Sequence, residues 1–513
     1  AEAQLLQHIT QIEDIPAALQ PLVAEGYINV VVDEQKNSVN QVRFSHDKIQ
    51  QAAYQLNRPT HKSVIHYQVA QYFINNQSTD GLDSNVFNYI EHLNIAAEHF
   101  MQHGQLLTLI KANTEAGEKA LEANANVDAL HYYNVALKHA DDVFWQKQYD
   151  IRFAIALGKA KACYLTQEYE QGNENYEQTL QYVNDLEALT ELTKIQVMSL
   201  IAQNNMSQAY ELGVSTLEKL SVVLPSSDDI GENYLNIEKY YSDKPINLLT
   251  ELPEIRDRQA VISLEILNTI QTPAYLISPN AFMCVAYASL ELFFTKGASA
   301  GSSKVLVTHA LLLCGAFNKF QEGQLFAQLA SAINEKYPSP YTQTETEFTK
   351  NVSVMHWNEH IDNTLVPLEA NFYRGIENGN IEYAFHSALF YCFHYIFSGK
   401  NLKKVSEVYK KYTELMANKR QAYQLMVSQI WQQFAFDLQK EKPPIHTLRG
   451  AAFNETQSLG YLEETNNVTT LFSYHQSKMI LAHLFDDQAL ALEQLSAAEP
   501  LSSSVVSLYH FAE

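Results

Sequence analysis

Proline and glycine are scarce in this sequence. The 513 residues include 14 Pro and 17 Gly, below the average usage of roughly 5% and 7%. Both residues mark turns and interrupt regular structure, so their scarcity argues against a fold of many short strands and tight turns. We therefore expect a mostly α-helical protein with long helices.

Cysteine is also rare. The chain has four, Cys163, Cys284, Cys314 and Cys392, which lie far apart, never form a C-x-x-C pair and sit in apolar helical contexts. This pattern argues against a disulfide framework or a cysteine-based metal site. We expect buried free thiols, no metal site and a cytoplasmic location.

Positive charge is in short supply. Lys and Arg number 35 against 58 Asp and Glu, which gives a net charge of -23. No run of Lys or Arg is longer than a pair such as Lys403-Lys404 or Lys410-Lys411. Phosphate backbones repel such a surface, so we expect no nucleic-acid partner.

Long apolar runs are absent as well. No stretch of about 18 apolar residues is free of polar interruption, and no signal peptide opens the chain, so we expect no membrane partner. The chain begins at Ala1 without Met and stops within an apparently helical pattern. We expect a fragment of a longer protein.

Length and composition allow a large folded structure. Hydrophobic residues make up 46% of the 513 and charged residues 18%, which are ordinary values for a soluble, folded protein. The length exceeds what one compact core usually supports. We expect several domains or a repeat array.

Residues 1–60 have the pattern of a small α/β module. Apolar residues follow helical spacing over 15–23, with Pro16 in the first turn and Gly26 as the C-cap. The β-prone runs 27–32 and 39–44 predict a hairpin. Helix then hairpin is typical of a winged-helix domain, but the predicted recognition helix, 16–25, has no Lys or Arg. DNA binding through it is therefore not expected.

The residues after the predicted hairpin carry a family resemblance. Residues 44–47, Phe-Ser-His-Asp, resemble the Met-His-Asp-type motif of winged-helix domains in STAND (signal-transduction) ATPases, whose histidine contacts the β-phosphate of ADP and holds the off state. The resemblance implies that His46 is a nucleotide sensor and Asp47 its orienting partner or helix N-cap, although Ser45 stands where the family has Met. Alternatively, Asp47 or Ser45 caps the next helix and His46 packs at its start.

A longer block resembles one class of signalling protein. Residues 43–54 are similar to the segment that joins an AAA-type ATPase to a helical region in very large microbial chains. Those chains run from a Ser/Thr-kinase-like domain through the ATPase and a tetratricopeptide-like region to a GAF domain and a sensor histidine kinase. Similar blocks recur at 88–94, 246–255, 311–315 and 356–357, so the resemblance covers most of the chain. It implies ATP or ADP in the parent protein and no cofactor in this fragment.

Small and apolar residues recur in the remaining chain as in a helical repeat. Tetratricopeptide repeats place such residues at fixed offsets where their two helices touch, over about 34 residues. Spacings of 3, 6, 3, 4 and 3 start at Gly117, Ala160, Val197 and Leu311, with a degenerate copy from Phe393. Neighbouring helix pairs would supply one continuous core. We predict a mostly α fold, a TPR-like α-solenoid of antiparallel helix pairs preceded by the winged-helix module.

Breaks in this pattern predict the domain organisation. Residues 222–257 contain Leu-Pro-Ser-Ser-Asp-Asp and Leu-Pro-Glu-Ile, which interrupt regular helices. We predict a winged-helix-like module at 1–60, TPR-like repeats at 61–224, an irregular boundary at 225–260 and a second TPR-like array at 261–513.

Two motifs suggest chemistry that their context does not support. His356-Trp-Asn-Glu-His360 matches H-x-x-E-H, in which two histidines one helical turn apart bind Zn²⁺, but a third ligand is needed and the flanks are typical of repeat helices. The segment 297–304, ending at Lys304, lacks the spacing of a phosphate loop and predicts a helix–helix loop. We do not expect an enzyme in this fragment.

These observations favour a regulatory, non-catalytic role. We expect a protein-interaction region of a multidomain signalling ATPase or kinase, whose solenoid surface binds protein partners and which contacts the adjacent ATPase and kinase domains. The alternative is a stand-alone TPR-like scaffold. A zinc hydrolase that uses His356 and His360 is a third hypothesis.

Overall fold

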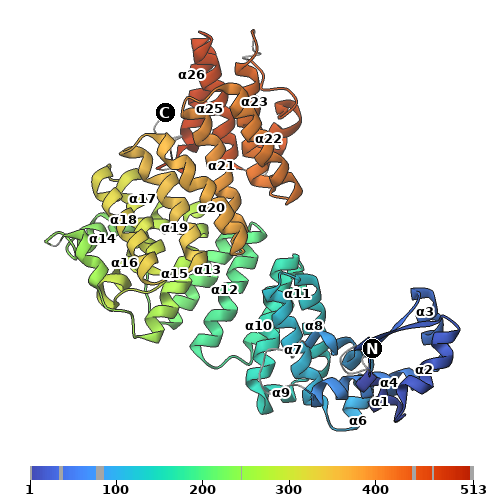
Figure 1. Cartoon of the computed structure of the whole chain (residues 1–513). Coiled ribbons are helices and arrows are strands. Elements are labelled where there is room, and N and C mark those ends of the chain that lie inside the picture. Colours follow the sequence, from blue (N-terminus) through green and yellow to red (C-terminus); the bar gives the residue numbers. More distant parts are fainter. Residues whose placement is uncertain are drawn as a thin grey trace. The chain divides into compact units, whose positions relative to one another are not determined.

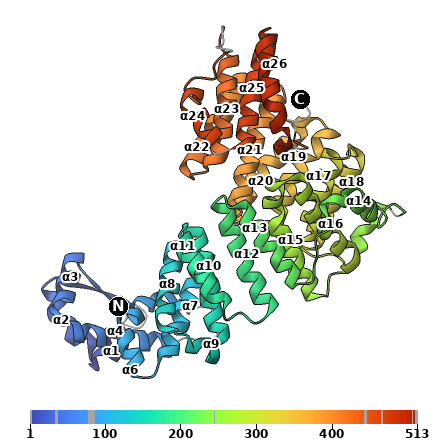
Figure 2. The ribbon, with the colours of Figure 1, turned by 180° about the vertical axis from the view of Figure 1, so that it is seen from behind.

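The computed structural model describes residues 3–33, 38–76, 86–243, 245–441, 446–464, 467–505 and 507–508. The chain divides into two compact units, Ala1–Ser199 (unit 1) and Leu200–Glu513 (unit 2). Within the described ranges, helices dominate both units and the strands form a single two-stranded sheet (Figures 1 and 2). The prediction of a mostly α-helical protein is confirmed.

The elements of unit 1 follow one another along the chain. They are α1 (Ala3–Thr10), α2 (Ile15–Ala24), β1 (Ile28–Asp33), β2 (Ser38–Phe44), α3 (Asp47–Leu56), α4 (Pro59–Asn75), η1 (Val86–Asn88), α5 (Ile90–Ile95), α6 (Ala97–Gln102), α7 (Leu106–Glu122), α8 (Asn126–His139), α9 (Val143–Lys147), α10 (Tyr149–Thr166) and α11 (Tyr169–Leu180). Helix α12 (Leu186–Ala202) begins in unit 1 and ends in unit 2.

Unit 2 continues with helices. They are α13 (Met206–Lys219), η2 (Ser227–Asp229), α14 (Ile230–Glu238), η3 (Ile246–Glu251), α15 (Arg258–Ile277), α16 (Pro279–Lys296), α17 (Ser302–Gly315), α18 (Phe320–Lys336), α19 (Pro340–Ser353), η4 (Met355–Trp357), η5 (Ile361–Thr364), α20 (Leu365–Glu377), α21 (Ile381–Phe397), α22 (Leu402–Asn418), α23 (Ala422–Leu438), α24 (Glu455–Glu464), α25 (Val468–Leu484), α26 (Gln488–Ala498) and η6 (Glu499–Val505).

The start of unit 1 contains the predicted helix and hairpin. The Asp14 carboxylate accepts from the Ala17 N–H at 2.9 Å and begins α2. Gly26, with φ of +74°, ends it, because glycine adopts this left-handed conformation without strain. Strands β1 and β2 pair antiparallel. Assignment of this module to the winged-helix class stays a prediction, and the hairpin loop at 34–37 lies outside the described residues.

Glycine residues allow close contacts between helices in unit 1. Tyr133 on α8 is buried and lies against Gly117 of α7 and Gly158 of α10, at positions where a Cβ would overlap the Tyr133 ring. Ala120, Ala129 and Ala136 of the same predicted repeat are also buried. The small-residue spacing therefore marks helix–helix contacts, as the sequence predicted.

Unit 2 consists mainly of consecutive helices packed in pairs. Helix α15 packs on α16, α17 on α18, α20 on α21, α22 on α23 and α25 on α26. Gly323 of α18 lies against the Cys314 sulfur of α17, where a Cβ would be 2.5 Å from Sγ. The aromatic stripe of α21 supplies Phe385 and Phe393 to a core that includes Trp431. This is the core packing expected from the sequence.

The irregular segment predicted at 225–260 lies inside unit 2, not between the two units. Tyr234 of α14 stacks on Phe317 with ring centroids 4.3 Å apart, and Lys319 Nζ donates to the Glu238 carboxylate at 2.6 Å. Tyr241 packs edge-on against Phe326. Proline and serine disrupt the helical pattern here, yet these contacts attach the segment to α17 and α18.

One described helix, α15, meets the length and hydropathy of a membrane span, and 56% of that stretch is buried inside the structure. It packs against α13, α16 and α17. These contacts give α15 the environment of a core helix in unit 2.

Candidate functional site

His46 lies at the start of α3, where it acts as the N-cap. Its Nδ1 accepts a hydrogen bond from the Lys48 backbone N–H at 3.1 Å, and the side chain is exposed. Because Nδ1 is the acceptor, the proton of the neutral ring is on Nε2. His46 therefore caps the helix and also presents an N–H donor that suits a phosphate oxygen.

Ser45 and Asp47, the alternative candidates for the N-cap, do not cap α3 with their side chains. Ser45 Oγ donates to the Gly26 carbonyl at 2.6 Å, which fixes the end of β2 against the turn after α2. Asp47 is exposed in the first turn of α3, where its charge favours the helix dipole. Its role as the orienting partner of His46 stays a prediction.

A cavity of about 480 Å³ lies between α3 and α4. Asp47, Tyr54, Lys62 and His66 contribute to its lining. Lys62 Nζ lies 4.3 Å from the centroid of the Tyr54 ring, and the Tyr54 hydroxyl is 3.1 Å from His66 Nε2. The structure thus brings Asp47, but not His46, into the lining of this cavity.

Many large apolar side chains of the N-terminal module are exposed. None of the residues of α3 is buried. The exposed fractions of these large apolar side chains run from 42% to 87%, and the residues are Ile12, Leu22, Val23, Tyr27, Val31, Phe44, Tyr54 and Leu56. A concentration of this kind is typical of a surface that contacts another protein or domain.

The zinc-like motif has the wrong local structure for a metal pair. His356 lies in η4, and His360 precedes η5, where its Nδ1 accepts from the Asp362 N–H at 3.2 Å. The two residues are therefore not one turn apart on an α-helix. Burial lowers the pKa of His356 to about 4. The described residues contain no group of three His, Cys, Asp or Glu that could hold a metal ion.

Side chains from alternate helices of unit 2 form a polar face, which we call the tyrosine–carboxylate face. It comprises Thr272 and Tyr275 of α15, Lys304 of α17, Tyr341 and Glu345 of α19, Glu382, Tyr383 and His386 of α21, and Tyr423 of α23. The intervening helices α16, α18, α20 and α22 contribute none of these residues.

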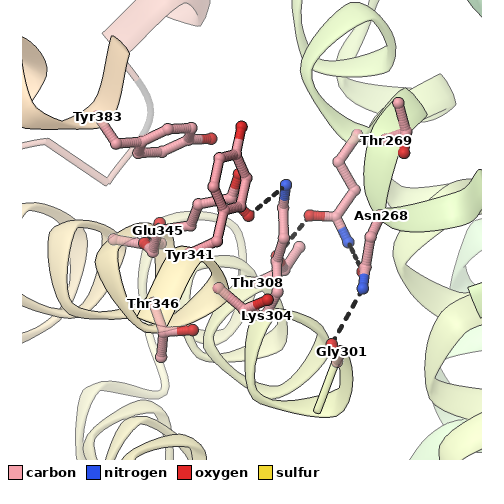
Figure 3. A network of polar contacts seen from close by, with 12 residues as sticks. Asn268, Thr269, Gly301, Lys304, Thr308, Tyr341, Glu345, Thr346 and Tyr383 are labelled. Atoms are coloured by element: carbon pink, nitrogen blue, oxygen red, sulfur yellow. Dashed lines mark hydrogen bonds and ion pairs between the residues drawn. The ribbon is translucent and has the colours of Figure 1, made fainter. Parts of the chain in front are cut away.

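An ion pair lies at the centre of this face. Lys304 Nζ is 2.9 Å from a Glu345 carboxylate oxygen, and both side chains are 12% exposed. The ammonium also lies 6.0 Å from the centroid of the Tyr383 ring. Figure 3 shows the Tyr341 and Tyr383 rings beside the pair. Lys304 is therefore held by a carboxylate and by the electron-rich faces of aromatic rings.

A chain of hydrogen bonds connects α17 to α15 beneath the ion pair (Figure 3). The Thr308 hydroxyl donates to Gln271 Oε1 at 2.9 Å, Gln271 Nε2 donates to Asn268 at 3.3 Å, and Asn268 donates to the Gly301 carbonyl at 3.0 Å. These bonds satisfy polar groups that packing has largely removed from water. They also fix the position of the first turns of α17, which carry Lys304.

Tyr383 lies where several helices converge. Burial raises its pKa well above the usual range, the Glu345 and Glu382 carboxylates add to the increase, and the Thr272 side chain interacts with its hydroxyl. The His386 ring is 6.0 Å from Tyr383 and 5.9 Å from Tyr423. Burial raises the pKa of Tyr423 to about 12. Side chains of α15 thus meet those of α21, although α17 and α19 lie between them in sequence.

Glu382 is the accessible carboxylate of the face. Its side chain is 57% exposed and lies 3.8 Å from His386 Nε2. Burial opposes its ionisation, but His386 and Lys304 hold its pKa below the usual value. Glu382 is therefore the carboxylate of the face that an incoming group can reach most easily.

The sequence interpretation did not find this face. The sequence predicts that Lys304 ends a glycine-containing helix–helix loop, whereas the structure places it in the first turn of α17. Glu345 and Glu382 carry no local motif. The available signal was the partly exposed polar stripe of α15, in which Asn268, Thr272 and Tyr275 recur at helical spacing.

Part of a signal transduction protein is similar to this chain in sequence. No family model matches the chain. It is 22% identical over 442 residues to hybrid signal transduction histidine kinase G of Dictyostelium discoideum, a match that covers 76% of this chain and 13% of that protein. The chain therefore spans about an eighth of the length of this relative.

Two solved structures are similar over most of the chain at low TM-score. One is a signal transduction ATPase with numerous domains (STAND) that has a tetratricopeptide repeat sensor, from Pyrococcus horikoshii, with 12% identity and a TM-score of 0.37 over 90% of this chain and 61% of that one. The other is Naa15/Naa10 bound to HypK-THB, with 11% identity and a TM-score of 0.16 over 97% of this chain and 95% of that one.

Proposed function

We propose that this chain is a non-catalytic regulatory and protein-interaction region of a multidomain signalling protein that contains ATPase and kinase modules. The observation that carries the proposal is the tyrosine–carboxylate face, a polar surface to which five alternate helices contribute charged or aromatic side chains. The similarity to a signal transduction histidine kinase supports the signalling context.

The N-terminal module would contact the ATPase of the parent protein. Its exposed apolar side chains, including Phe44, Tyr54 and Leu56, supply the surface for that contact. The exposed Nε2–H of His46 would donate to the β-phosphate of ADP, while Nδ1 continues to cap α3. No nucleotide is needed within this chain itself.

Regulation would follow from differential binding. A partner on unit 2, or a nucleotide in the ATPase, shifts the conformational equilibrium of the parent only by its difference in affinity for the two states. Because coupling between two binding sites is reciprocal, nucleotide state would also change the affinity of the chain for its partner.

The decisive experiment separates the two roles of His46. The chain is titrated with the ATPase segment of its parent protein in ADP and in ATP, with wild type, His46→Asn and His46→Ala. Asparagine is a good N-cap, so His46→Asn keeps α3 and removes the Nε2–H donor. We expect tighter binding in ADP than in ATP for wild type, and loss of that preference in both variants.

Each contrary result has a distinct meaning. If His46→Asn keeps the ADP preference and only His46→Ala loses it, His46 is a helix cap and not a sensor. Binding that does not depend on nucleotide would make the chain a passive connector. A parent gene without an ATPase would favour the stand-alone scaffold.

A further inference from the structure

The charges of the tyrosine–carboxylate face do not balance. Lys304 neutralises Glu345 at 2.9 Å. Glu382 instead lies 3.8 Å from His386, whose ring carries a charge only when it is protonated. With neutral His386, the two carboxylates face a single ammonium, and the more exposed carboxylate is the one without a permanent cation at salt-bridge distance.

Exposure decides which groups a ligand reaches. Lys304 and Glu345 are 12% exposed, so their pair is largely complete as it stands. Glu382 is 57% exposed at its side chain, and Tyr341 is 46% exposed. An incoming group therefore meets the Glu382 carboxylate and tyrosine rings first.

The face already shows how it holds a cation. Lys304 lies beside the Glu345 carboxylate and 6.0 Å from the Tyr383 ring centroid, an arrangement of one carboxylate and aromatic surface around one ammonium (Figure 3). Glu382 stands next to Tyr383 in the chain, and its neighbour His386 packs against Tyr423 at 5.9 Å. The Glu382 carboxylate raises the pKa of Tyr383, so these two side chains lie in the same part of the face. Lys304 also acts on Glu382 but is already paired with Glu345.

We propose that the tyrosine–carboxylate face binds an arginine or lysine side chain from a basic segment of a protein partner, with Glu382 as its counter-ion. This inference rests on the proposed function and names the chemistry of the partner. Tyrosine faces attract cations, and a guanidinium stacks on them while pairing with a carboxylate. The net charge of -23 would also steer a basic segment toward the chain.

The test uses three short fluorescent peptides and the whole chain at 150 mM salt. The peptides have the sequence acetyl-Gly-Ser-X-Ser-Gly, where X is arginine, lysine or citrulline, and citrulline is the neutral isostere of arginine. We expect saturable binding of the two cationic peptides, and at least tenfold weaker binding of the citrulline peptide. Equal binding of all three, or no binding of the cationic peptides, would overturn the proposal.

A matched pair of variants places the site. Glu382→Gln removes the negative charge of Glu382 from the face. Glu414→Gln removes the charge of another exposed carboxylate, on α22. We expect Glu382→Gln to weaken binding of the arginine peptide about tenfold. Glu414→Gln should change the dissociation constant of that peptide less than twofold. Equal effects would show that only the overall negative charge attracts the peptide.

The outcomes also separate this inference from the function on which it rests. If the ATPase segment binds the chain and the arginine peptide does not, the regulatory function stands and the cation site is wrong. If the peptide binds at Glu382 and no module of the parent binds the chain, the cation site stands and the relay role is wrong.

Discussion

His309 is a buried histidine with an unusual electrostatic environment. It is fully inside unit 2, with the Tyr241 hydroxyl 3.3 Å from its Nε2. Burial, and then the nearby Lys319 charge, lower its pKa to about 3, against a smaller opposite effect of Glu238. The folded protein therefore holds His309 neutral at pH values where an unfolded chain, with an ordinary histidine pKa of about 6.5, binds a proton.

This difference predicts a pH dependence of stability. Between pH 6.5 and 3 the unfolded state binds more protons than the folded state, so stability falls as the pH is lowered, by up to about 1.4 kcal/mol per unit for one group. In scanning calorimetry, we expect the melting temperature of His309→Gln to fall less than that of wild type when the pH is lowered from 7.5 to 5. His483→Gln, at an exposed histidine, is the control and should follow wild type.

The Lys304–Glu345 pair gives a second prediction at this scale. Because both side chains are 12% exposed, removing one partner leaves a poorly solvated charge, which costs about 3 kcal/mol in buried pairs. Lys304→Met should therefore destabilise unit 2 by about this amount in urea unfolding. The double variant Lys304→Met with Glu345→Gln should recover most of the lost free energy of unfolding. If it recovers none, the buried Glu345 charge is not the cause of the destabilisation.

At the scale of helices, glycine sets how closely α13 and α15 approach. A Cβ at Gly213 of α13 would overlap the Ile270 side chain of α15. Alanine is favoured over glycine inside a helix by about 1 kcal/mol, but overpacking costs about 1 to 3 kcal/mol. We expect Gly213→Ala to lower the melting temperature.

Gly460 provides the matched control for this substitution. It lies within α24, and a Cβ there would have no neighbour within 4 Å. Gly460→Ala should therefore raise stability by up to about 1 kcal/mol. Equal effects of the two substitutions would show that helix propensity, and not the contact between α13 and α15, decides the change in stability.

Local signals explain which elements the sequence could predict. Asp14, Pro16 and Gly26 mark both ends of α2 within a few residues, and the buried Tyr133 and Gly117 lie at predicted repeat positions. The face of unit 2 was not predictable in this way, because Lys304, Glu345 and Glu382 come from three helices. Spacing within a helix shows which residues share a side of it, but not which helices converge there.

The segment 225–260 shows a second limit of local patterns. Its Pro, Ser and Asp residues correctly indicated irregular backbone, with two short 3-10 helices and α14. They carried no information about docking, which depends on Lys319, Phe317 and Phe326 far along the chain. Composition therefore indicates irregular backbone, but not which helices the segment contacts.

At the scale of the whole molecule, the proposed regulatory role requires the chain to transmit a signal and not only to bind. His46 lies in unit 1 and the tyrosine–carboxylate face in unit 2. A relay must therefore change unit 2 when the nucleotide in the proposed ATPase module changes. A simple docking surface would change only the module that touches the ATPase.

Hydrogen–deuterium exchange tests this distinction most directly. The chain is mixed with a saturating amount of its parent's ATPase segment, in ADP and in ATP, and backbone exchange is followed by mass spectrometry across both units. If the chain is a relay, we expect nucleotide-dependent exchange around α3 and also in α17, α19 and α21 of unit 2. Differences confined to residues 1–60, with identical exchange throughout unit 2, would contradict the relay role.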